Sequence, residues 1–566
     1  MQKFSEVPYQ RPDMVQFKKD YRELVNVFEN AESFEQAKEI FFELQEMESS
    51  LYTTYTIASI RNTMDTTDKF YEKEIAFFNK ELPKLISIQK KYLKVLLKNR
   101  YREQMEAEFG PHLFKDAEVE QRVQSTKIVQ DLVKEANLST DYQKTVATCK
   151  TNFRGEECNF YGLLKHMESP DREERKEAFH AWAKMYEETA PTLDDLYDKL
   201  VAVRVTMAKK LDFENYIPLA YLGKHRMDYT SKEVEKFREQ VLKVIVPACA
   251  KLRELQAKRI GVEKLKYYDE MFMFPDGNPD PIGNKDQMVA WAKEMYQELS
   301  SETAEFFNFM VEHELFDLET RPGKHMGGYC TSLSEYKAPF IFSNFNGTSA
   351  DVDVLTHEAG HAFESYTTAR CQKIAAYRHS TSEINEIHSM SMEHFTYPWM
   401  DKFFGENAEK YRYAHLCSAL LVIPYMMCVD EFQHRVFVNP TMTADERRSV
   451  WHEIEQKYMP WRDYDGVDYM EKGGFWMQKQ HIFLYPFYYI DYALAQIGAF
   501  EFYSKMKKDQ NEAWNDYLKL CRAGGSTGYF ELLKIANLSN PFEEGSVEKA
   551  VSSILKEIEE SKFSEV

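Results

Sequence analysis

The chain has 566 residues, of which 43% are hydrophobic, while glycine and proline are sparse at 21 and 19 residues. This composition is typical of an ordered globular protein and excludes disordered, collagen-like and low-complexity classes. The formal net charge of −20 argues against nucleic acid or an anionic membrane surface as a partner, because proteins bind both largely through lysine and arginine.

The N-terminus and the cysteines indicate a cytoplasmic protein. Residues 1–9 lack the apolar stretch of a secretory signal. The most apolar run, residues 416–429, is too short for a membrane span and contains a proline, so we expect no transmembrane helix. The eight cysteines are scattered without a C-x-x-C pair, which favours reduced thiols over a disulfide framework.

The first half of the chain has the periodicity of helices. Apolar residues recur at three- and four-residue spacing, as between Met14 and Phe28. Capping boxes, in which Ser or Thr is followed three residues later by Gln or Glu, mark helix starts at Ser33, Thr230 and Thr443. We therefore expect successive helices that pack on one another.

The pattern changes between residues 262 and 350. Two short runs, residues 327–332 and 339–345, contain aromatic and β-branched residues bounded by glycine and proline. They predict a small hairpin embedded in a helical protein. The hairpin could be purely structural, or it could present an edge to a binding site.

The next stretch contains His357-Glu-Ala-Gly-His361 on a helix that we expect to start near Thr348. Histidines four residues apart lie on one helix face, so both imidazoles can bind one metal ion. Glu358 stands where its carboxylate can take a proton from water. Chance would produce only roughly 0.04 such matches in a chain with 15 histidines.

A catalytic zinc ion normally has three protein ligands. Ser380 with Glu383 predicts a capping box that opens the following helix, and Glu383 would then belong to the cap. Glu386 is the predicted third ligand. Glu393, seven residues later on the same face, is the predicted partner of a ligating histidine.

Two histidines of the same helix remain alternative ligands. His388 lies two residues from Glu386 and therefore points away from its face. His394 follows Glu393 directly.

The zinc motif and the helix after it together resemble the thimet-oligopeptidase-like zinc metallopeptidases, in the oligoendopeptidase F and Pz-peptidase branch. The similarity extends over residues 223–229, 339–347 and 481–492. The resemblance implies a mainly α fold, a two-lobed helical ellipsoid with a deep central channel and one small sheet near the zinc site. It suggests an N-terminal helical lobe over residues 1–180 and a catalytic region over 181–566.

The segment 472–492 is rich in tyrosine hydroxyls, which can stabilise a tetrahedral oxyanion. Tyr485, Tyr489 and Tyr492 have helical spacing and would share one face, although an aromatic core stripe has the same pattern. The resemblance implies that His481, Tyr485, Tyr489 and Tyr492 bind the substrate carbonyl and oxyanion. Because the spacing from His481 is one residue shorter than in the thimet branch, Tyr488 is an alternative to Tyr485.

The sequence therefore predicts an endopeptidase with one Zn²⁺ per chain, held by His357, His361 and Glu386, and with Glu358 as general base. Its expected partners are short oligopeptides, and the chain is expected to be a monomer or a small homo-oligomer.

The strand over residues 327–332 or the one over 340–345 is expected to bind the peptide backbone as an added strand, with Gly327, Gly328 and Tyr329 as the candidate substrate-binding residues. One alternative is a carboxypeptidase or dipeptidyl carboxypeptidase on the same fold, for which the sequence identifies no basic residue to hold a terminal carboxylate. Another is an inactive, zinc-retaining peptide-binding scaffold, which would not need Glu358.

Overall fold

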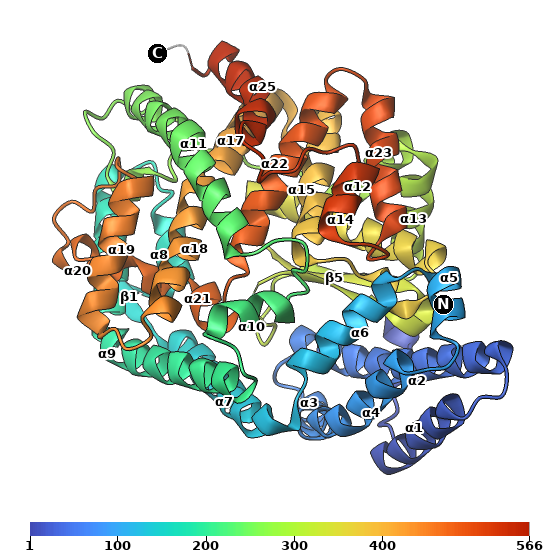
Figure 1. Ribbon diagram of the computed structural model, residues 1–566. Helices are drawn as coiled ribbons and strands as arrows, with labels where there is room; N and C mark the ends of the chain where they lie inside the picture. Colours follow the sequence, from blue (N-terminus) through green and yellow to red (C-terminus); the bar gives the residue numbers. More distant parts are fainter. Residues whose placement is uncertain (326, 565–566) are drawn as a thin grey trace.

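The computed structural model describes residues 1–325 and 327–564. Helices account for 72% of the structure and strands for 4%, which confirms the mainly α prediction. Figure 1 shows the helices gathered around a small sheet near the centre of the molecule.

The N-terminal helices pack together at the lower right of Figure 1. They are α1 (Met14–Glu29), α2 (Phe34–Met64), α3 (Lys69–Glu81), α4 (Ile86–Leu97), α5 (Arg102–Phe109) and α6 (His112–Val123). Most of their buried apolar side chains form one core cluster, which Ile374 and Tyr377 join from a later segment.

A second, larger core cluster spans the rest of the chain. Its middle helices are α7 (Val129–Thr148), α8 (Phe160–His166), α9 (Arg172–Lys210), α10 (Tyr216–Gly223), α11 (Ser231–Arg259), α12 (Lys285–Leu299) and α13 (Ser301–Glu312). The boundary expected at residue 180 falls inside α9, and the division of the chain into two regions there stays a prediction.

The C-terminal half carries the remaining helices. They are α14 (Ser349–Cys371), α15 (Ser382–Phe395), α16 (Met400–Phe404), α17 (Ala408–Leu421), α18 (Ile423–Val438), α19 (Ala444–Tyr458), α20 (Asp468–Glu471), α21 (Gln480–Leu484), α22 (Tyr489–Met506), α23 (Gln510–Ala523), α24 (Tyr529–Ile535) and α25 (Ser546–Glu560). The capping boxes predicted at Thr230 and Thr443 are formed at the starts of α11 and α19.

The predicted hairpin is present as β4 (Tyr329–Leu333) and β5 (Ala338–Phe345), which pair antiparallel. A further strand, β3 (Phe316–Glu319), pairs parallel with β5, so the order is β3-β5-β4 and β4 is an edge strand. The sequence did not predict β3, because four residues are too few to show a period. A separate hairpin joins β1 (Thr151–Phe153) and β2 (Glu156–Cys158).

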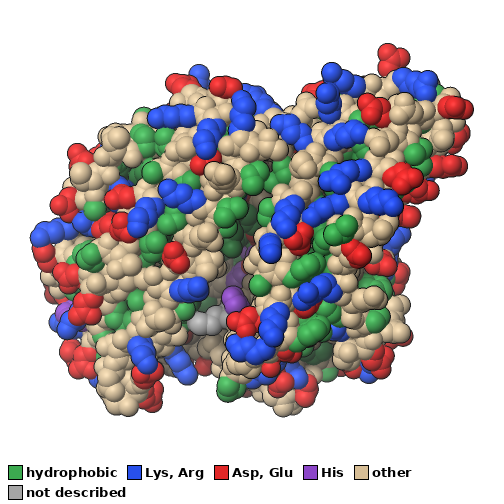
Figure 2. Space-filling model, turned by 90° about the horizontal axis from the view of Figure 1, so that it is seen from below, with side chains coloured by type: hydrophobic (Ala, Val, Ile, Leu, Met, Phe, Trp, Pro, Cys, Tyr) green, Lys and Arg blue, Asp and Glu red, His purple; other side chains and the backbone are tan. Residues whose placement is uncertain are grey.

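The surface is hollowed between two parts of the molecule. Figure 2 shows a furrow on one face, with histidine side chains in its depth. A cavity of about 420 Å³ lies beside α14, which carries His357 and His361, and its walls include Asp353 of α14 and His415 of α17. These hollows agree with the channel that the resemblance implied.

One stretch of the chain has the length and composition of a membrane span. Within Ala375–Val438, a window of 18 residues reaches a mean hydropathy of 1.4. However, 67% of that window is buried inside the protein, as expected for a core helix.

His225 joins the two core regions. It follows α10, and its ring nitrogens contact two carboxylates of α6, Asp116 at 3.2 Å and Glu120 at 2.7 Å. We refer to these three residues as the His225 clasp.

The His225 clasp predicts how stability depends on pH. Hydrogen bonds with Asp116 and Glu120 raise the pKa of His225 to about 9, above the value of about 6.5 expected in the unfolded chain. Because the folded state holds this proton more tightly, the clasp stabilises fully below about pH 6.5 and loses its contribution as the pH rises through 9. The difference in melting temperature between wild type and His225→Gln should therefore shrink over this interval.

His180→Gln, at an exposed histidine, is the matched control, and its effect should not follow this pH dependence. A constant difference for His225→Gln from about pH 6 to about pH 10 would contradict the clasp.

Candidate active site

Helix α14 places the two histidines of the motif beside each other. The ring centroids of His357 and His361 lie 5.0 Å apart, with the ring planes at 86°. The opposite side of the helix packs into the core through Leu355 and Ala359, which are fully buried. This burial fixes the rotation of α14 and keeps both imidazoles toward the half-exposed side.

Helix α15 brings the predicted third ligand to these histidines. Oε2 of Glu386 lies 3.4 Å from Nε2 of His357 and 3.5 Å from Nε2 of His361. Donor atoms at about 2.0–2.1 Å around a tetrahedral zinc ion stand roughly 3.3–3.4 Å from one another. The Glu386 oxygen therefore stands at the separation from both imidazoles that a bound zinc ion requires, and the three ligand atoms all lie within 4.8 Å of one another.

This convergence depends on Gly360, which lies between the two histidines. A Cβ atom at this position would lie 2.7 Å from Cα of Ser389 and 2.8 Å from the carbonyl oxygen of His388. Both contacts are with the backbone of α15, which cannot turn aside as a side chain can. The absence of a side chain at Gly360 thus allows α14 and α15 to approach closely enough for Glu386 to reach the histidines.

Electrostatics keep the carboxylates of the site ionised. Burial alone would raise the pKa of Glu386, but His361 and His357 outweigh burial and hold it well below its usual range. Ser389 also donates to Glu386 at 3.0 Å. The Tyr488 hydroxyl donates to its other oxygen at 2.9 Å.

Glu393 contacts His357 as predicted, with its Oε1 2.5 Å from Nδ1. Its Oε2 lies 2.8 Å from Nε2 of His415, and Nδ1 of His415 lies 2.6 Å from the Tyr397 hydroxyl. Burial would raise the pKa of Glu393, but the two histidines lower it to about 2. Neither His415 nor Tyr397 was predicted from the sequence, because both reach the site only through tertiary packing.

Glu358 follows His357 on α14 and is half-buried. Its carboxylate has no hydrogen-bond or ion-pair partner among the described residues. Its oxygens are therefore available to accept a proton from a water molecule near the histidines.

His481 lies among the tyrosines, with ring centroids 5.0 Å from Tyr489 and 6.1 Å from Tyr492. The Tyr488 ring also lies 6.1 Å from the His481 ring, and its hydroxyl donates a hydrogen bond to Glu386. The Tyr485 ring lies 5.9 Å from His481, but this side chain is 52% exposed. Of the two tyrosines left open by the sequence, Tyr488 is thus the one that touches a predicted metal ligand.

The continuous helix expected through these tyrosines is wrong. Helix α21 ends at Leu484 and α22 begins at Tyr489, with Pro486 and Phe487 between them. A residue before proline avoids helical angles, and Phe487 has a left-handed φ of 61°. Tyr485 therefore shares no helix face with Tyr489.

The capping box expected at Ser380 and Glu383 is not formed. Helix α15 begins at Ser382 after Thr381, without a side-chain cap. Glu383 is buried instead and accepts a hydrogen bond from Tyr229 at 3.2 Å. Burial raises the pKa of Glu383 to about 7. Glu383 is therefore part of the buried interior rather than a helix cap.

The alternative ligands His388 and His394 do not join the site. Both are buried in the core. Neither belongs to the group formed by His357, His361 and Glu386.

Gly327 and Gly328 precede the edge strand β4, and Tyr329 is its first residue. The Tyr329 ring stacks on Phe342 at 4.9 Å, and its hydroxyl bonds Thr63 at 2.6 Å. The Tyr329 side chain is therefore engaged within the protein.

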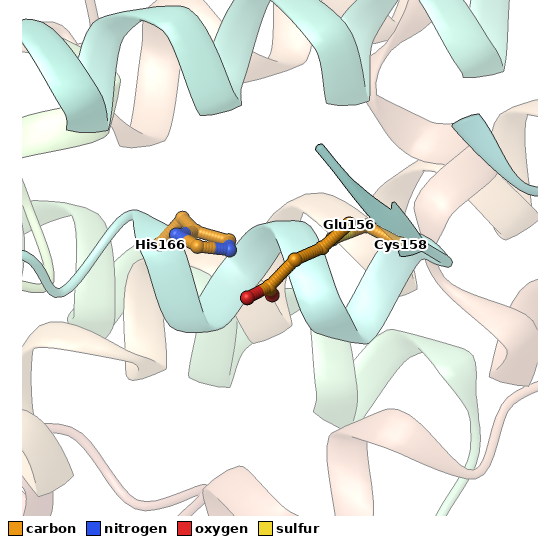
Figure 3. A group of neighbouring side chains, drawn as sticks. All are labelled: Glu156, Cys158 and His166. Carbon is orange, nitrogen blue, oxygen red and sulfur yellow. The ribbon is translucent and has the colours of Figure 1, made fainter. Parts of the chain in front are cut away.

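A second group of candidate ligands lies on β2 and α8. Ligand atoms of Glu156, Cys158 and His166 also lie within 4.8 Å of one another, and Figure 3 shows the Glu156 carboxylate turned toward the imidazole. Burial raises the pKa of the Cys158 thiol, which favours the protonated form. The adjacent Glu157 pairs with Lys150 at 2.9 Å. Glu157 is therefore not free to act as a base, in contrast to Glu358 beside His357.

Comparison with known proteins gives two family matches. The Peptidase M3 N-terminal domain matches residues 4–124, and Peptidase family M3 matches residues 165–275 and 286–551. The solved structure of PZ peptidase A with an inhibitor has a TM-score of 0.95 and 48% identity, covering 99% of this chain and 100% of that one.

Curated relatives are more distant. The group B oligopeptidase PepB of Streptococcus agalactiae is 24% identical, covering 89% of this chain and 87% of that protein. The oligoendopeptidase F homologue of Borreliella burgdorferi is 22% identical over 70% of this chain, and the match spans 66% of that relative's length.

The close approach at Gly360 predicts that Gly360→Ala separates α14 from α15. We expect a loss of about 1–3 kcal/mol in the free energy of unfolding, as for other overpacked sites. Because Glu386 moves with α15, metal content after dialysis against limiting zinc should fall as well. Denaturant melts and elemental analysis measure the two effects.

Gly223→Ala is the matched control, since a Cβ at that helical glycine meets nothing within 4 Å. Full metal content and unchanged stability in Gly360→Ala would contradict the proposed role of this contact.

Proposed function

The chain belongs to peptidase family M3, and from this premise we propose that it is a zinc-dependent endopeptidase that cleaves short oligopeptides. The observation that carries the proposal is the meeting of three ligand groups, His357, His361 and Glu386, beside the free carboxylate of Glu358. An inactive zinc-retaining scaffold would need the ligands but not this base.

Two imidazoles and a carboxylate are a donor set found in catalytic zinc sites, where the fourth position stays open. Zinc bound there would supply a Lewis acid that polarises a peptide carbonyl and lowers the pKa of water. Glu393 would orient the His357 ring through Nδ1, which leaves Nε2 available as the ligand.

The chain's own side chains supply the proton transfers and the hydrogen bonds. Glu358 would accept a proton from the attacking water and pass it to the leaving nitrogen. Burial lowers the pKa of His481 to about 4, so at neutral pH its ring is uncharged and can donate an N–H. The Tyr489 hydroxyl makes no hydrogen bond among the described residues, and we assign it to the developing oxyanion.

The edge of β4 would pair with the backbone of an extended peptide. Such pairing depends little on the side chains of the peptide. The surrounding helices would admit short peptides and exclude folded proteins. All eight cysteines are unpaired, which suits the cytoplasmic location that we propose.

Digestion of a defined peptide library, with and without a chelator, tests the proposal. Mass spectrometry should show internal cleavage of short peptides, loss of cleavage on chelation and recovery on adding zinc. Cleavage confined to the C-terminus would favour a carboxypeptidase or dipeptidyl carboxypeptidase instead. Cleavage that persists without metal would contradict the proposal.

Glu358→Gln should retain zinc and lose turnover by about 10²–10⁴-fold, because an amide cannot accept the proton from water. Glu386→Ala, in contrast, should lose the metal itself. Elemental analysis beside steady-state kinetics separates the two variants. Near-normal kcat in Glu358→Gln would show that another group is the base.

Tyr489→Phe removes only the hydroxyl that we assign to the oxyanion. We expect kcat to fall by about 10²–10³-fold with KM little changed, since the interaction forms in the transition state. A tyrosine that served only in packing would tolerate this change with at most about 1 kcal/mol lost in stability. Unchanged kcat with a lower melting temperature would therefore assign Tyr489 to the core. Tyr485→Phe, at the exposed tyrosine, is the matched control.

A further inference from the structure

Two lysines flank the tyrosines of the candidate active site. Nζ of Lys224 lies 4.8 Å from the ring centroid of Tyr488, and Nζ of Lys479 lies 4.9 Å from that of Tyr489. Both lysines are partly exposed. Each ammonium group thus lies against a side chain that belongs to the site.

Neither ammonium group forms an ion pair within the described part of the chain. Among the described residues, no carboxylate lies within 4.0 Å of Nζ of Lys224 or of Lys479. Arg226, two residues after Lys224, is paired instead: it forms a fully buried ion pair with Asp491. Free cations at this position stand out in a chain whose net charge is −20.

Two arginines in a neighbouring cavity provide the contrast. In the cavity of about 420 Å³, the guanidinium groups of Arg253 and Arg462 both bind Glu270, at 3.0 and 2.8 Å. Their charge is therefore already compensated. An anionic group entering the site finds uncompensated positive charge on the tyrosine side instead.

The charges of both lysines act on His481. Burial is the main cause that lowers its pKa to about 4. The charge of Lys479 lowers it further, the charge of Glu386 opposes this, and the charge of Lys224 adds a smaller lowering effect. The positive field of both ammonium groups thus reaches the centre of the tyrosine cluster.

We propose that Lys224 and Lys479 form a subsite for a carboxylate of the substrate peptide. The subsite rests on the proposed peptidase function and specifies its substrates. The carboxylate could be the C-terminus of the peptide or the side chain of Asp or Glu, because an ammonium group binds both in the same way.

The geometry limits how far this carboxylate lies from the bond that is cut. Lys224 contacts the Tyr488 ring, and the Tyr488 hydroxyl bonds Glu386 at 2.9 Å. The path from Nζ to the metal ligand is therefore at most about 10 Å, which about three extended residues span at roughly 3.3–3.6 Å each. Cleavage should fall within about three residues of the carboxylate.

Matched peptides test the subsite. Each peptide is prepared with a free and an amidated C-terminus, and with Glu or Gln near the cleaved bond. The peptide with the preferred carboxylate should have a KM at least about 10-fold lower than its neutral counterpart, as expected for a hydrogen bond to a charged group. Comparing the two pairs of peptides shows whether the terminus or the side chain is bound.

Lys224→Gln and Lys479→Gln should raise KM for the anionic peptide by about 10-fold while leaving the neutral peptide unchanged. Lys479→Arg, which keeps the charge, should retain the preference. Lys232→Gln, at an exposed lysine outside the site, controls for net charge. Far-UV circular dichroism melts confirm that each variant is folded.

Equal KM for anionic and neutral peptides in the wild type would overturn the subsite while leaving the peptidase function intact. Equal damage to both kinds of peptide in the lysine variants would overturn it as well, because the lysines would then support the site as a whole. Failure to cleave any peptide in the library would instead overturn the proposed function, and with it the subsite.

Discussion

The contact between α14 and α15 at Gly360 is the constraint on which the candidate active site depends. It sets the distance between the histidines of one helix and Glu386 of the other. Helix α15 also packs along α22, which carries Tyr489, while β5 supports α14 from the sheet side. The metal ligands, the base and the tyrosines thus derive their positions from one set of helix contacts, and a shift at Gly360 would reach all of them.

A buried ion pair positions the segment that carries the tyrosines beside the metal ligands. Arg226 donates to the carbonyl of Phe487 at 2.6 Å and pairs with Asp491, so it fixes the break between α21 and α22. Removing one partner of such a buried pair typically costs about 3–5 kcal/mol, because the other charge is left unpaired. The segment that contains Arg226 also contains Lys224. The residue that positions the tyrosine segment and the one that we propose to bind a substrate carboxylate therefore lie two positions apart on the same segment.

Features that depend on local spacing could be predicted from the sequence, whereas those that depend on tertiary packing could not. Helical periodicity, the hairpin and the placing of His357 and His361 on one helix face follow from patterns within a few turns of chain. Glu386 was predicted as a third ligand on the next helix, but its approach to the histidines depends on the packing of α14 against α15. His415 and the two flanking lysines come from distant segments, and no local pattern connects them to the metal ligands. The errors at Glu383 and in the helix through residues 485–492 arose where a favourable local pattern competed with burial and with proline geometry.

Anomalous X-ray diffraction from a zinc-soaked crystal tests the central claim most directly. Data collected above and below the zinc absorption edge should give one strong peak about 2.0–2.2 Å from Nε2 of both motif histidines and from a carboxylate oxygen of Glu386. A peak among Glu156, Cys158 and His166, with none between α14 and α15, would contradict the assignment. So would full peptidase activity in a crystal whose anomalous map shows no metal beside His357.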